Sequence, residues 1–416
     1  MRLLGRGALS AVWLEDDDRR RGGDSVARTS ALAIKATRKS LLVTLRVVDA
    51  AIREKLALEA VGVESPFVAR LRNAAQSEDT VLLRMDAVLW NGQSAMSLRR
   101  LVQHAQLPRP SACCVATCLM SAVAHLHERG VAHRDIKPDN VCVSADGACV
   151  LVDFGAARCF PPDERSMSLV GTVAYLAPEM VTRRGHGCEV DWWSLGIVLA
   201  EALSGEPPFA HASSHAELAE ALESARASGG ASLEIEALGA QPSTGSSRRW
   251  EGEAHGAESG AESAQSADLG AKLGAELGAD MATEACDADE GGGRLDLQGL
   301  LPALLTHEPI ARAAAARRWL ATHRANDSDH TEAVRVGGAS LLAHARAAAS
   351  ADAAAHGEVG SPSPQDDVDE EEMWAREERE ALLERADANW RRTAEQWQTA
   401  FAEYGRPYVR WELAQT

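Results

Sequence analysis

The sequence has few aromatic residues and few positive charges for its length. Only 4% of its 416 residues are Phe, Trp or Tyr although 45% are apolar, so alanine supplies much of the apolar content. Lys and Arg together number 43 against 61 Asp and Glu, which gives a formal net charge of −18. Because such a chain is repelled by phosphate backbones and anionic lipids, we expect no general binding to nucleic acid or to acidic membranes.

Cysteine pairs at zinc-site spacing, long apolar runs and a leader segment are also missing. The eight cysteines include no two CxxC pairs, and Cys114 and Cys118 lie four residues apart in a helix-like run, as small core residues do. No apolar run approaches the roughly 20 residues that span a bilayer, so no membrane span is predicted. The first residues form no apolar signal segment. These absences favour a reducing, cytoplasmic location, with the nucleus as the alternative.

Residues 1–90 alternate short apolar runs with polar turns, which favours a small β-rich unit. Its apolar centres lie at positions 3–4, 12–14, 32–34 and 81–83. Residues 50–61 repeat apolar side chains with a helical period, so one helix is predicted there. Because the first apolar centre lies so close to the start of the sequence, the first strand is expected to be clipped.

Residues 91–320 are mainly helical by pattern. Two predicted helices, at 111–127 and 191–203, are each followed by a glycine that would end them. An acidic low-complexity stretch at about 227–293, with recurring Gly-Ala-Glu units, interrupts this half and is expected to be disordered. The apolar helical pattern returns at 295–305, so the helical half would be completed beyond the insert.

Residues 321–371 are rich in Ala, Ser and Asp and are expected to be a disordered linker. Residues 372–416 are expected to form an amphipathic helix and a tail. Its larger apolar residues recur every seven positions: Leu383, Trp390, Trp397 and Tyr404. Such a stripe needs a partner surface. The helix would dock on the chain's own domain or, as the alternative, residues 372–404 would bind a partner helix.

The stretch from His133 to Asn140, followed by Asp153-Phe154-Gly155, is the most informative part of the chain. Asp135 and Asp153 lie 18 positions apart, which leaves room for one short strand pair that brings both carboxylates to one point. Phosphoryl transfer needs a carboxylate that orients a hydroxyl, a lysine on the phosphate, and Asn and Asp oxygens on Mg²⁺. This stretch contains all of these groups.

A glycine-rich turn and a lysine in an apolar strand extend the set. Gly5, Gly7 and Ser10 are small enough for the backbone to approach phosphate oxygens. Lys35 lies in an apolar run, where it needs a partner because burying an isolated ammonium is costly. The predicted helix that follows offers two carboxylates: Glu54 and Glu59.

With these motifs in place, the chain resembles a eukaryotic-type serine/threonine protein kinase. The matching segments, in chain order, are the glycine-rich loop, Lys35, Glu54, and residues 133–140, 153–155, 177–179 and 191–196. Within kinases the AGC group, and especially its cyclic-nucleotide-dependent members, is most similar. The resemblance implies an α+β, two-lobed fold, with a small β-rich N-lobe containing one main helix and a larger helical C-lobe. It also implies ATP and Mg²⁺ as cofactors and a protein as substrate.

The resemblance assigns roles to individual residues. Asp135 would orient the substrate hydroxyl and accept its proton, Lys137 would neutralise the moving phosphate, and Thr172 would favour Ser and Thr acceptors. Asn140 and Asp153 would hold Mg²⁺. The residues implied in nucleotide binding are Gly5, Gly7, Ser10, Val12, Ala33, Lys35, Glu54, Met85, Asp86, Ala87 and Cys142.

The same resemblance places the adenine base. Val12 and Ala33 would lie on one side of the base and Cys142 on the other. Met85 would be the gatekeeper, and residues 86–87 would form the hinge between the lobes.

Further residues would support and regulate the site. By resemblance, Glu179 would pair with Arg312 beyond the acidic insert, and Asp191 would brace the catalytic loop. Arg134 precedes the catalytic carboxylate and needs a countercharge. Ser168 lies where the family carries its activating phosphate, which an upstream kinase would add.

Substrate choice and the tail give weaker signals. By resemblance, Glu201 matches an acidic position that family members use for basic substrates, and Asp139 would add to it. A preference for Arg or Lys before the acceptor is therefore expected. Phe401 and Tyr404 resemble the family's hydrophobic tail motif only faintly, so the resemblance does not imply activation by tail docking. The leading interpretation is an active ATP-dependent serine/threonine kinase in intracellular signalling. The alternative is a catalytically weak pseudokinase that acts as a scaffold through its acidic insert and C-terminal helix.

Overall fold

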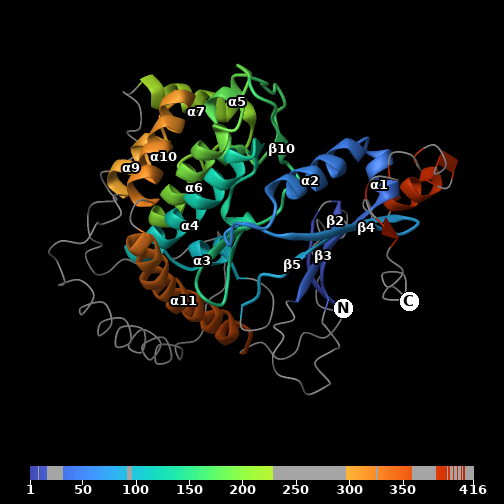
Figure 1. The fold of residues 1–416 in the computed structure, drawn as a ribbon, viewed down its shortest axis with the longest axis horizontal. Coiled ribbons are helices and arrows are strands. Elements are labelled where there is room, and N and C mark those ends of the chain that lie inside the picture. The colour runs from blue at the N-terminus through green and yellow to red at the C-terminus, as the bar shows by residue number, and fades with distance from the viewer. Residues whose placement is uncertain are drawn as a thin grey trace, which may run out of the picture. The chain divides into compact units, whose positions relative to one another are not determined.

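The computed structural model describes most of the chain. The described residues are 1–7, 9–15, 31–90, 96–227, 297–324, 327–357 and 381–390, together with 392, 393, 397, 401, 404, 406 and 407. They form a β-rich N-terminal lobe and a helical C-terminal lobe, as the sequence predicted (Figure 1). The acidic insert expected at about 227–293 lies outside the described residues, apart from position 227 at the end of a helix.

The N-lobe is built on one six-stranded sheet in the order β1-β2-β3-β5-β4-β11. The strands are β1 (Arg2–Arg6), β2 (Ser10–Glu15), β3 (Leu32–Arg38), β4 (Leu71–Gln76), β5 (Thr80–Asp86) and β11 (Arg406–Pro407). Ile34, Ala36, Ala75 and Leu82 form its buried core, with the partly buried Trp13 packed against them. The first strand is present as five residues paired with β2, and β4 was not predicted because its sequence is largely polar.

Two helices pack on this sheet. The short helix α1 (Lys39–Thr44) continues directly from β3, and α2 (Val48–Val61) is the helix predicted at 50–61. The buried face of α2 includes Ala51, Glu54 and Leu58. Because α2 also contacts β7 and β10 of the other lobe, Glu54 is held close to the junction between the lobes (Figure 1).

The C-lobe is arranged around two long buried helices, α4 and α6 (Figure 1). Its helices are α3 (Leu98–His104), α4 (Arg109–Glu128), α5 (Pro178–Val181), α6 (Val190–Ser204), α7 (His215–Ala227), α9 (Leu297–Leu304), α10 (Pro309–Arg324) and α11 (Asp327–Gly357). Gly130 and Gly205 follow α4 and α6 with φ values of 68° and 91°, so both predicted helix ends are confirmed.

Short strands and two 3₁₀ turns carry the loops at the junction of the lobes. They are β6 (Met96–Ser97), β7 (Val131–Ala132), β8 (Val141–Val143), β9 (Cys149–Leu151), β10 (Arg158–Cys159), and the turns Pro138–Asn140 and Val173–Tyr175. Among the described helices only α4 is long and apolar enough to cross a membrane. It has the character of a core helix, because 78% of its apolar window is buried inside the fold.

Helix α11 corrects the expectation of a disordered linker at 321–371. Residues Asp327–Gly357 form one continuous helix that packs along α4. Its buried stripe consists of small residues and one leucine: Gly337, Gly338, Leu341, Ala345 and Ala348. Alanine is the best helix former, and small side chains let two helices approach closely. The composition that indicated a loose linker therefore forms a closely packed helix.

The C-terminal segment docks on the chain's own N-lobe. Residues 381–390 are helical, and the Ser40 hydroxyl donates a 2.7 Å hydrogen bond to the Asp387 carboxylate. Arg38 also pairs with Asp387, at 3.2 Å. Strand β11 adds a parallel edge to β4. Of the two alternatives for residues 372–404, the described positions therefore show docking on the same chain.

The two residues of the faint tail motif are buried in the structure. Phe401 and Tyr404 are 2% and 3% exposed. The ammonium of Lys39 lies 5.2 Å from the ring centre of Phe401 and 5.9 Å from that of Trp390, within cation–π range. Burial lowers the pKa of Lys39, although Asp79 and Glu78 oppose this shift.

Candidate active site

The predicted catalytic residues meet in one hydrogen-bonded cluster. The turn between β7 and β8 carries Asp135 and Lys137, and their side chains form an ion pair of 3.0 Å. Thr172 donates twice to the other Asp135 carboxylate oxygen, through its amide at 3.0 Å and its hydroxyl at 2.8 Å. Lys137 in turn donates to the Thr172 hydroxyl at 2.7 Å. The three residues therefore form a closed triangle although 35 positions separate Lys137 from Thr172.

Asn140 fixes the other side of the Asp135 carboxylate. Its side-chain amide donates to the Asp135 backbone carbonyl at 2.8 Å and to a carboxylate oxygen at 3.1 Å. With the amide nitrogen used in this way, the Asn140 side-chain oxygen remains as an acceptor. Asn140 therefore both restrains Asp135 and presents a hard oxygen donor.

Lys35 contacts two carboxylates, Glu54 of its own lobe and Asp153 of the other lobe. Its ammonium donates to Glu54 at 2.6 Å and to Asp153 at 2.7 Å. Burial alone would lower the pKa of Lys35, but the two carboxylates outweigh burial and raise it. Burial raises the pKa of Asp153 as well, yet Lys35 reverses that effect and the net shift is downward. Lys35 is therefore a fixed cation, and its glutamate partner is Glu54, whereas Glu59 pairs with Lys55.

The donor set fits a magnesium ion held mainly by phosphate. Asn140 and Asp153 offer hard oxygen donors, which Mg²⁺ prefers, and one protein carboxylate with substrate phosphates is a common arrangement. Within the described residues no group of three or more His, Cys, Asp or Glu is placed to hold a metal alone. Asn140 and Asp153 would hold such an ion through one amide oxygen and one carboxylate.

Asp191 braces the catalytic loop from α6. It is fully buried, and its two carboxylate oxygens accept the backbone amides of His133 and Arg134, both at 2.8 Å. The His127 ring nitrogen lies 2.9 Å from the same carboxylate. Burial raises the pKa of Asp191, but these partners more than compensate and lower it. The brace stabilises a strained turn, because Arg134 has a φ of 63°.

The glycine-rich loop and the hinge lie on the N-lobe side. Gly5 is on β1, Ser10 begins β2, and the Gly7 amide donates to the Ser10 carbonyl at 2.8 Å. In the hinge, the Asp86 amide donates to Arg70 and the Ala87 amide to Ala31. Because both predicted hinge amides are used within the protein, only their carbonyls remain for an adenine base.

The apolar residues predicted around adenine come from both lobes. Val12 on β2 pairs in register with Lys35, and Ala33 on β3 pairs with Met85 on β5. Cys142 lies on β8 of the other lobe, where burial raises the pKa of its thiol to about 12. Cys142 is therefore a neutral, apolar surface at ordinary pH.

The activation segment places Ser168 against Arg134. The Arg134 guanidinium donates to the Ser168 hydroxyl at 2.8 Å, and Ser168 is exposed. The buried Ser166 hydroxyl lies 2.8 Å from that of Ser168 and accepts from Arg158 at 3.2 Å. Two guanidinium groups therefore converge near one accessible serine. Sequence reasoning identified Arg134 and missed Arg158, whose place on β10 close to Ser166 was the available signal.

The remaining structural pair also forms. Arg312 on α10 makes an ion pair with Glu179 on α5, and both side chains are buried. Arg312 also donates to the Thr306 carbonyl at 2.8 Å and lies 5.5 Å from the Trp193 ring centre. The C-lobe is thus completed by residues beyond the acidic insert, as predicted.

The acidic pair expected to bind basic substrates already has a cation. Arg99 on α3 pairs with Glu201 and with Asp139, the latter at 3.1 Å. The Tyr175 hydroxyl donates to the second Glu201 oxygen at 2.6 Å. Glu201 is fully buried. A substrate cation would therefore compete with Arg99, a residue that sequence reasoning did not single out.

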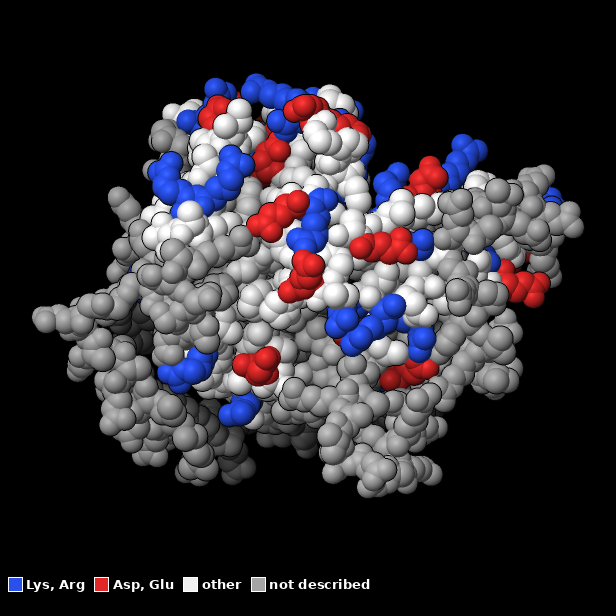
Figure 2. All heavy atoms as spheres, in the orientation of Figure 1, with Lys and Arg blue, Asp and Glu red and all other residues white. Residues whose placement is uncertain are grey.

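Charged side chains on the face drawn in Figure 2 alternate in sign among the described residues. Lys and Arg are interspersed with Asp and Glu, and neither sign covers this face in a continuous patch. This distribution differs from the single basic stripe that marks many nucleic-acid-binding surfaces.

Comparison with known proteins agrees with this geometry. The protein kinase domain family matches residues 1–313. The serine/threonine-protein kinase AtPK1/AtPK6 of Arabidopsis thaliana is 41% identical over 148 residues, which are 35% of this chain and 31% of the relative. The cGMP-dependent protein kinase 2 of Rattus norvegicus is 34% identical over 179 residues, 43% of this chain and 23% of the relative.

Ribosomal protein S6 kinase alpha-4 of Homo sapiens is a third relative, 34% identical over 213 residues, 50% of this chain and 26% of its own length. The chain thus spans less than a third of the length of these curated relatives. Two of the three carry AGC-group names, in line with the predicted subgroup. From the matched domain, the two-lobed fold and these relatives, the chain belongs to the protein kinase family, among the serine/threonine kinases.

Proposed function

We propose that this chain is an active kinase that transfers the γ-phosphate of Mg-ATP to Ser or Thr hydroxyls of protein substrates in intracellular signalling. The observation that carries the proposal is the closed contact between Asp135, Lys137 and Thr172. A scaffold without catalysis would not require this triangle, nor the fixed cation of Lys35 facing it across the lobe junction.

Each residue has a defined task in this reaction. Asp135 accepts a hydrogen bond from the substrate hydroxyl and receives its proton as the phosphoryl group transfers. Lys35 holds the non-transferred phosphates, and Lys137 neutralises charge on the group in transfer. Mg²⁺ bound by Asn140 and Asp153 would shield the phosphate oxygens. Thr172 keeps Asp135 oriented, since it donates two hydrogen bonds to one oxygen.

The catalytic role of Asp135 is tested with Asp135→Asn. The amide retains the shape of the side chain but cannot accept the proton, so phosphorylation of a Ser-containing peptide should fall by about 10² to 10⁴. Asp146→Asn, in the turn between β8 and β9, is the matched control because Asp146 is exposed and accepts hydrogen bonds from Ser144 and Ala148 of its own turn. Steady-state radiolabel transfer measures both variants. Equal rates for wild type and Asp135→Asn would favour the pseudokinase alternative.

We also propose that a phosphate on Ser168 activates the chain. Arg134 and Arg158 would each donate charge-assisted hydrogen bonds to it and hold the segment that carries Thr172. Ser168→Ala should lower the rate by roughly ten-fold or more, since each such bond contributes about 1.5–3 kcal/mol. Ser350→Ala, on the exposed side of α11, is the control. Mass spectrometry verifies the phosphate on Ser168 of the wild-type protein. If Ser168→Ala were as active as fully phosphorylated wild type, the proposal would be contradicted.

A further inference from the structure

His186 is a buried histidine with a free ring nitrogen beside the activation segment. The residue is 1% exposed, and its Nε2 is buried without a hydrogen-bond partner among the described residues. A buried polar atom without a partner is uncommon and costs free energy comparable to a lost hydrogen bond. A hydrogen-bonding group placed beside this nitrogen would therefore stabilise the site.

The backbone places the His186 ring on the same face as the Ser166 hydroxyl. The Ser166 amide donates to the His186 carbonyl at 2.8 Å, and the His186 amide donates back to the Ser166 carbonyl at 2.9 Å. Side chains of two residues that are directly opposite in such an antiparallel pair leave the backbone on one face. The Ser166 hydroxyl lies 2.8 Å from that of Ser168. A phosphate on Ser168 would therefore lie on the side of the pair that carries the ring.

Phe160 links the His186 ring to Arg158. The ring centres of Phe160 and His186 are 6.2 Å apart in edge contact, and the Arg158 guanidinium lies 5.2 Å from the Phe160 ring centre. Arg158 also donates to the Ser166 hydroxyl at 3.2 Å. The histidine ring, one guanidinium and the two serine hydroxyls thus gather in one region of the activation segment.

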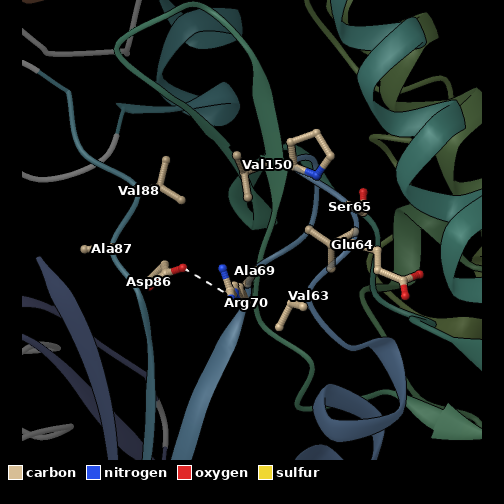
Figure 3. Close-up of a pocket in the computed structure, with 11 residues that line it drawn as sticks. Val63, Glu64, Ser65, Ala69, Arg70, Asp86, Ala87, Val88 and Val150 are labelled. Carbon is tan, nitrogen blue, oxygen red and sulfur yellow. Dashed lines mark ion pairs between the residues drawn. The ribbon is translucent and has the colours of Figure 1, made fainter. Parts of the chain in front are cut away.

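The guanidinium of Arg134, on the other side of Ser168, contacts only neutral groups among the described residues. Arg134 is 6% exposed, and its guanidinium donates to the Ala156 carbonyl and to the Ser168 hydroxyl, both at 2.8 Å. By contrast, Arg70 at the pocket of about 330 Å³ beside the hinge forms an ion pair with Asp86, at 4.0 Å (Figure 3). Because a buried cation is costly without an anion in contact, the surroundings of Arg134 favour a negatively charged partner.

The charges around His186 decide its protonation state. Burial lowers the pKa of His186 to about 4, and Arg134 of the catalytic loop and Arg158 of β10 add to this shift. Glu189 and Asp191, at the start of α6, oppose it. A phosphoserine in the activation segment carries a charge of about −1.5 to −2 at neutral pH. Beside the ring it would counteract the two arginines and favour the imidazolium.

We propose that His186 is a third ligand of a phosphate on Ser168 and binds it as the imidazolium. This inference rests on the phosphorylation of Ser168 proposed above. The ring donates its Nε2–H to one phosphate oxygen while Arg134 and Arg158 donate to the others, which matches the three acceptor oxygens of a phosphate. The phosphate thereby satisfies the free ring nitrogen and contacts the buried guanidinium in one step.

The test compares the full chain carrying phosphoserine at position 168, introduced during translation, with the unphosphorylated chain. Histidine rings are labelled with carbon-13, and His186 is identified as the signal that His186→Gln lacks. Its titration midpoint should rise by about one pH unit or more in the phosphorylated chain. The exposed His211 and His215 should titrate at the same pH in both chains. If none of the thirteen histidine signals shifts upward, the proposal is overturned without recourse to any variant.

A second measurement reports the hold on the phosphate. A general phosphatase should remove the phosphate from His186→Gln about ten-fold faster than from wild type, as the loss of one charge-assisted hydrogen bond predicts. His211→Gln, at an exposed histidine, should lose its phosphate at the wild-type rate. Equal rates for wild type and a folded His186→Gln would contradict the assignment of His186.

Neither readout depends on phosphoryl transfer by this chain. If both give the expected result while the phosphorylated and unphosphorylated chains have equal kinase rates, His186 is confirmed as a ligand of the phosphate. Only the activating role proposed for Ser168 would then be contradicted.

Discussion

At the residue scale, His186 is a buried titratable group whose ring lies near two arginines. It is 1% exposed, its Nε2 has no hydrogen-bond partner among the described residues, and its backbone pairs with Ser166. Burial lowers the pKa of His186 to about 4, and Arg134 and Arg158 add to the shift against the opposing charges of Glu189 and Asp191. The ring therefore stays neutral in the folded protein at ordinary pH.

This neutral histidine predicts an acid-sensitive fold. Between the unfolded pKa of about 6.5 and the folded pKa, the unfolded chain binds a proton that the folded chain does not. As the pH is lowered through this window, the free energy of unfolding should therefore decrease by up to about 1.4 kcal/mol per pH unit. His186→Gln should remove that slope, as measured by urea unfolding between pH 7 and pH 5.

The exposed His215 provides the control, because His215→Gln should leave the slope unchanged. If His186→Gln retained the wild-type slope, the acid sensitivity would come from other groups.

Buried Lys35 differs from His186 because it stays charged in the folded protein. Its two carboxylate partners keep it charged in spite of burial, whereas His186 has neighbouring cations.

At the scale of elements, the small residues of α11 let this helix pack closely against α4. A Cβ added at Gly337 would lie 2.3 Å from the Pro110 carbonyl oxygen and 2.7 Å from the Cys114 Cβ. The Ser111 hydroxyl donates to Ser340 at 2.9 Å, so the contact is also fixed in register. Close approach of α11 and α4 therefore depends on glycine at this position.

Gly337→Val should destabilise the protein by about 1–3 kcal/mol, because the added side chain overpacks a closed contact. Valine is a better helix former than glycine, so any loss of stability reports the contact itself. Ala339→Val, at an exposed position of the same helix, should change the unfolding free energy by less than about 0.5 kcal/mol. Equal denaturation curves for the two variants would show that α11 is not held at Gly337.

Helices could be predicted from the sequence where apolar periodicity and residue composition agree. Helices α2, α4 and α6 combine apolar spacing with a terminal glycine, and the catalytic residues lie in short local motifs. The helix at α11 was not predicted because alanine and serine give little hydrophobic periodicity, although they pack well against α4. The contact of Arg99 with Glu201 was not predicted for another reason. It joins residues 102 positions apart, and only tertiary structure brings them together.

At the scale of the whole molecule, the two lobes are connected by contacts between distant segments. Lys35 of the sheet reaches Asp153, and the His125 ring of α4 bonds to the Val61 carbonyl at the end of α2. The tail adds a further connection, because the chain returns from α11 in the C-lobe to the N-lobe sheet. The position of α2, and with it Glu54, thus depends on packing from several parts of the chain.

Phe401→Ala tests how far the tail supports this arrangement. Truncation of a buried phenylalanine costs about 3–5 kcal/mol when the site cannot collapse. Here the loss should appear as release of the tail, because the substitution removes the ring that packs on Lys39 and leaves only the backbone hydrogen bond from Gln76 at this position. Limited proteolysis should cut the segment after residue 380 several-fold faster in this variant. Burial raises the pKa of Tyr404, and the charges of Glu54 and Glu59 add to the shift. Because Glu54 holds Lys35, kinase activity should also fall if release of the tail disturbs α2. Glu384→Ala, at an exposed position of the same segment, should alter neither property. If Phe401→Ala left the cleavage rate at the wild-type value, the tail would be held by Asp387 and β11 alone.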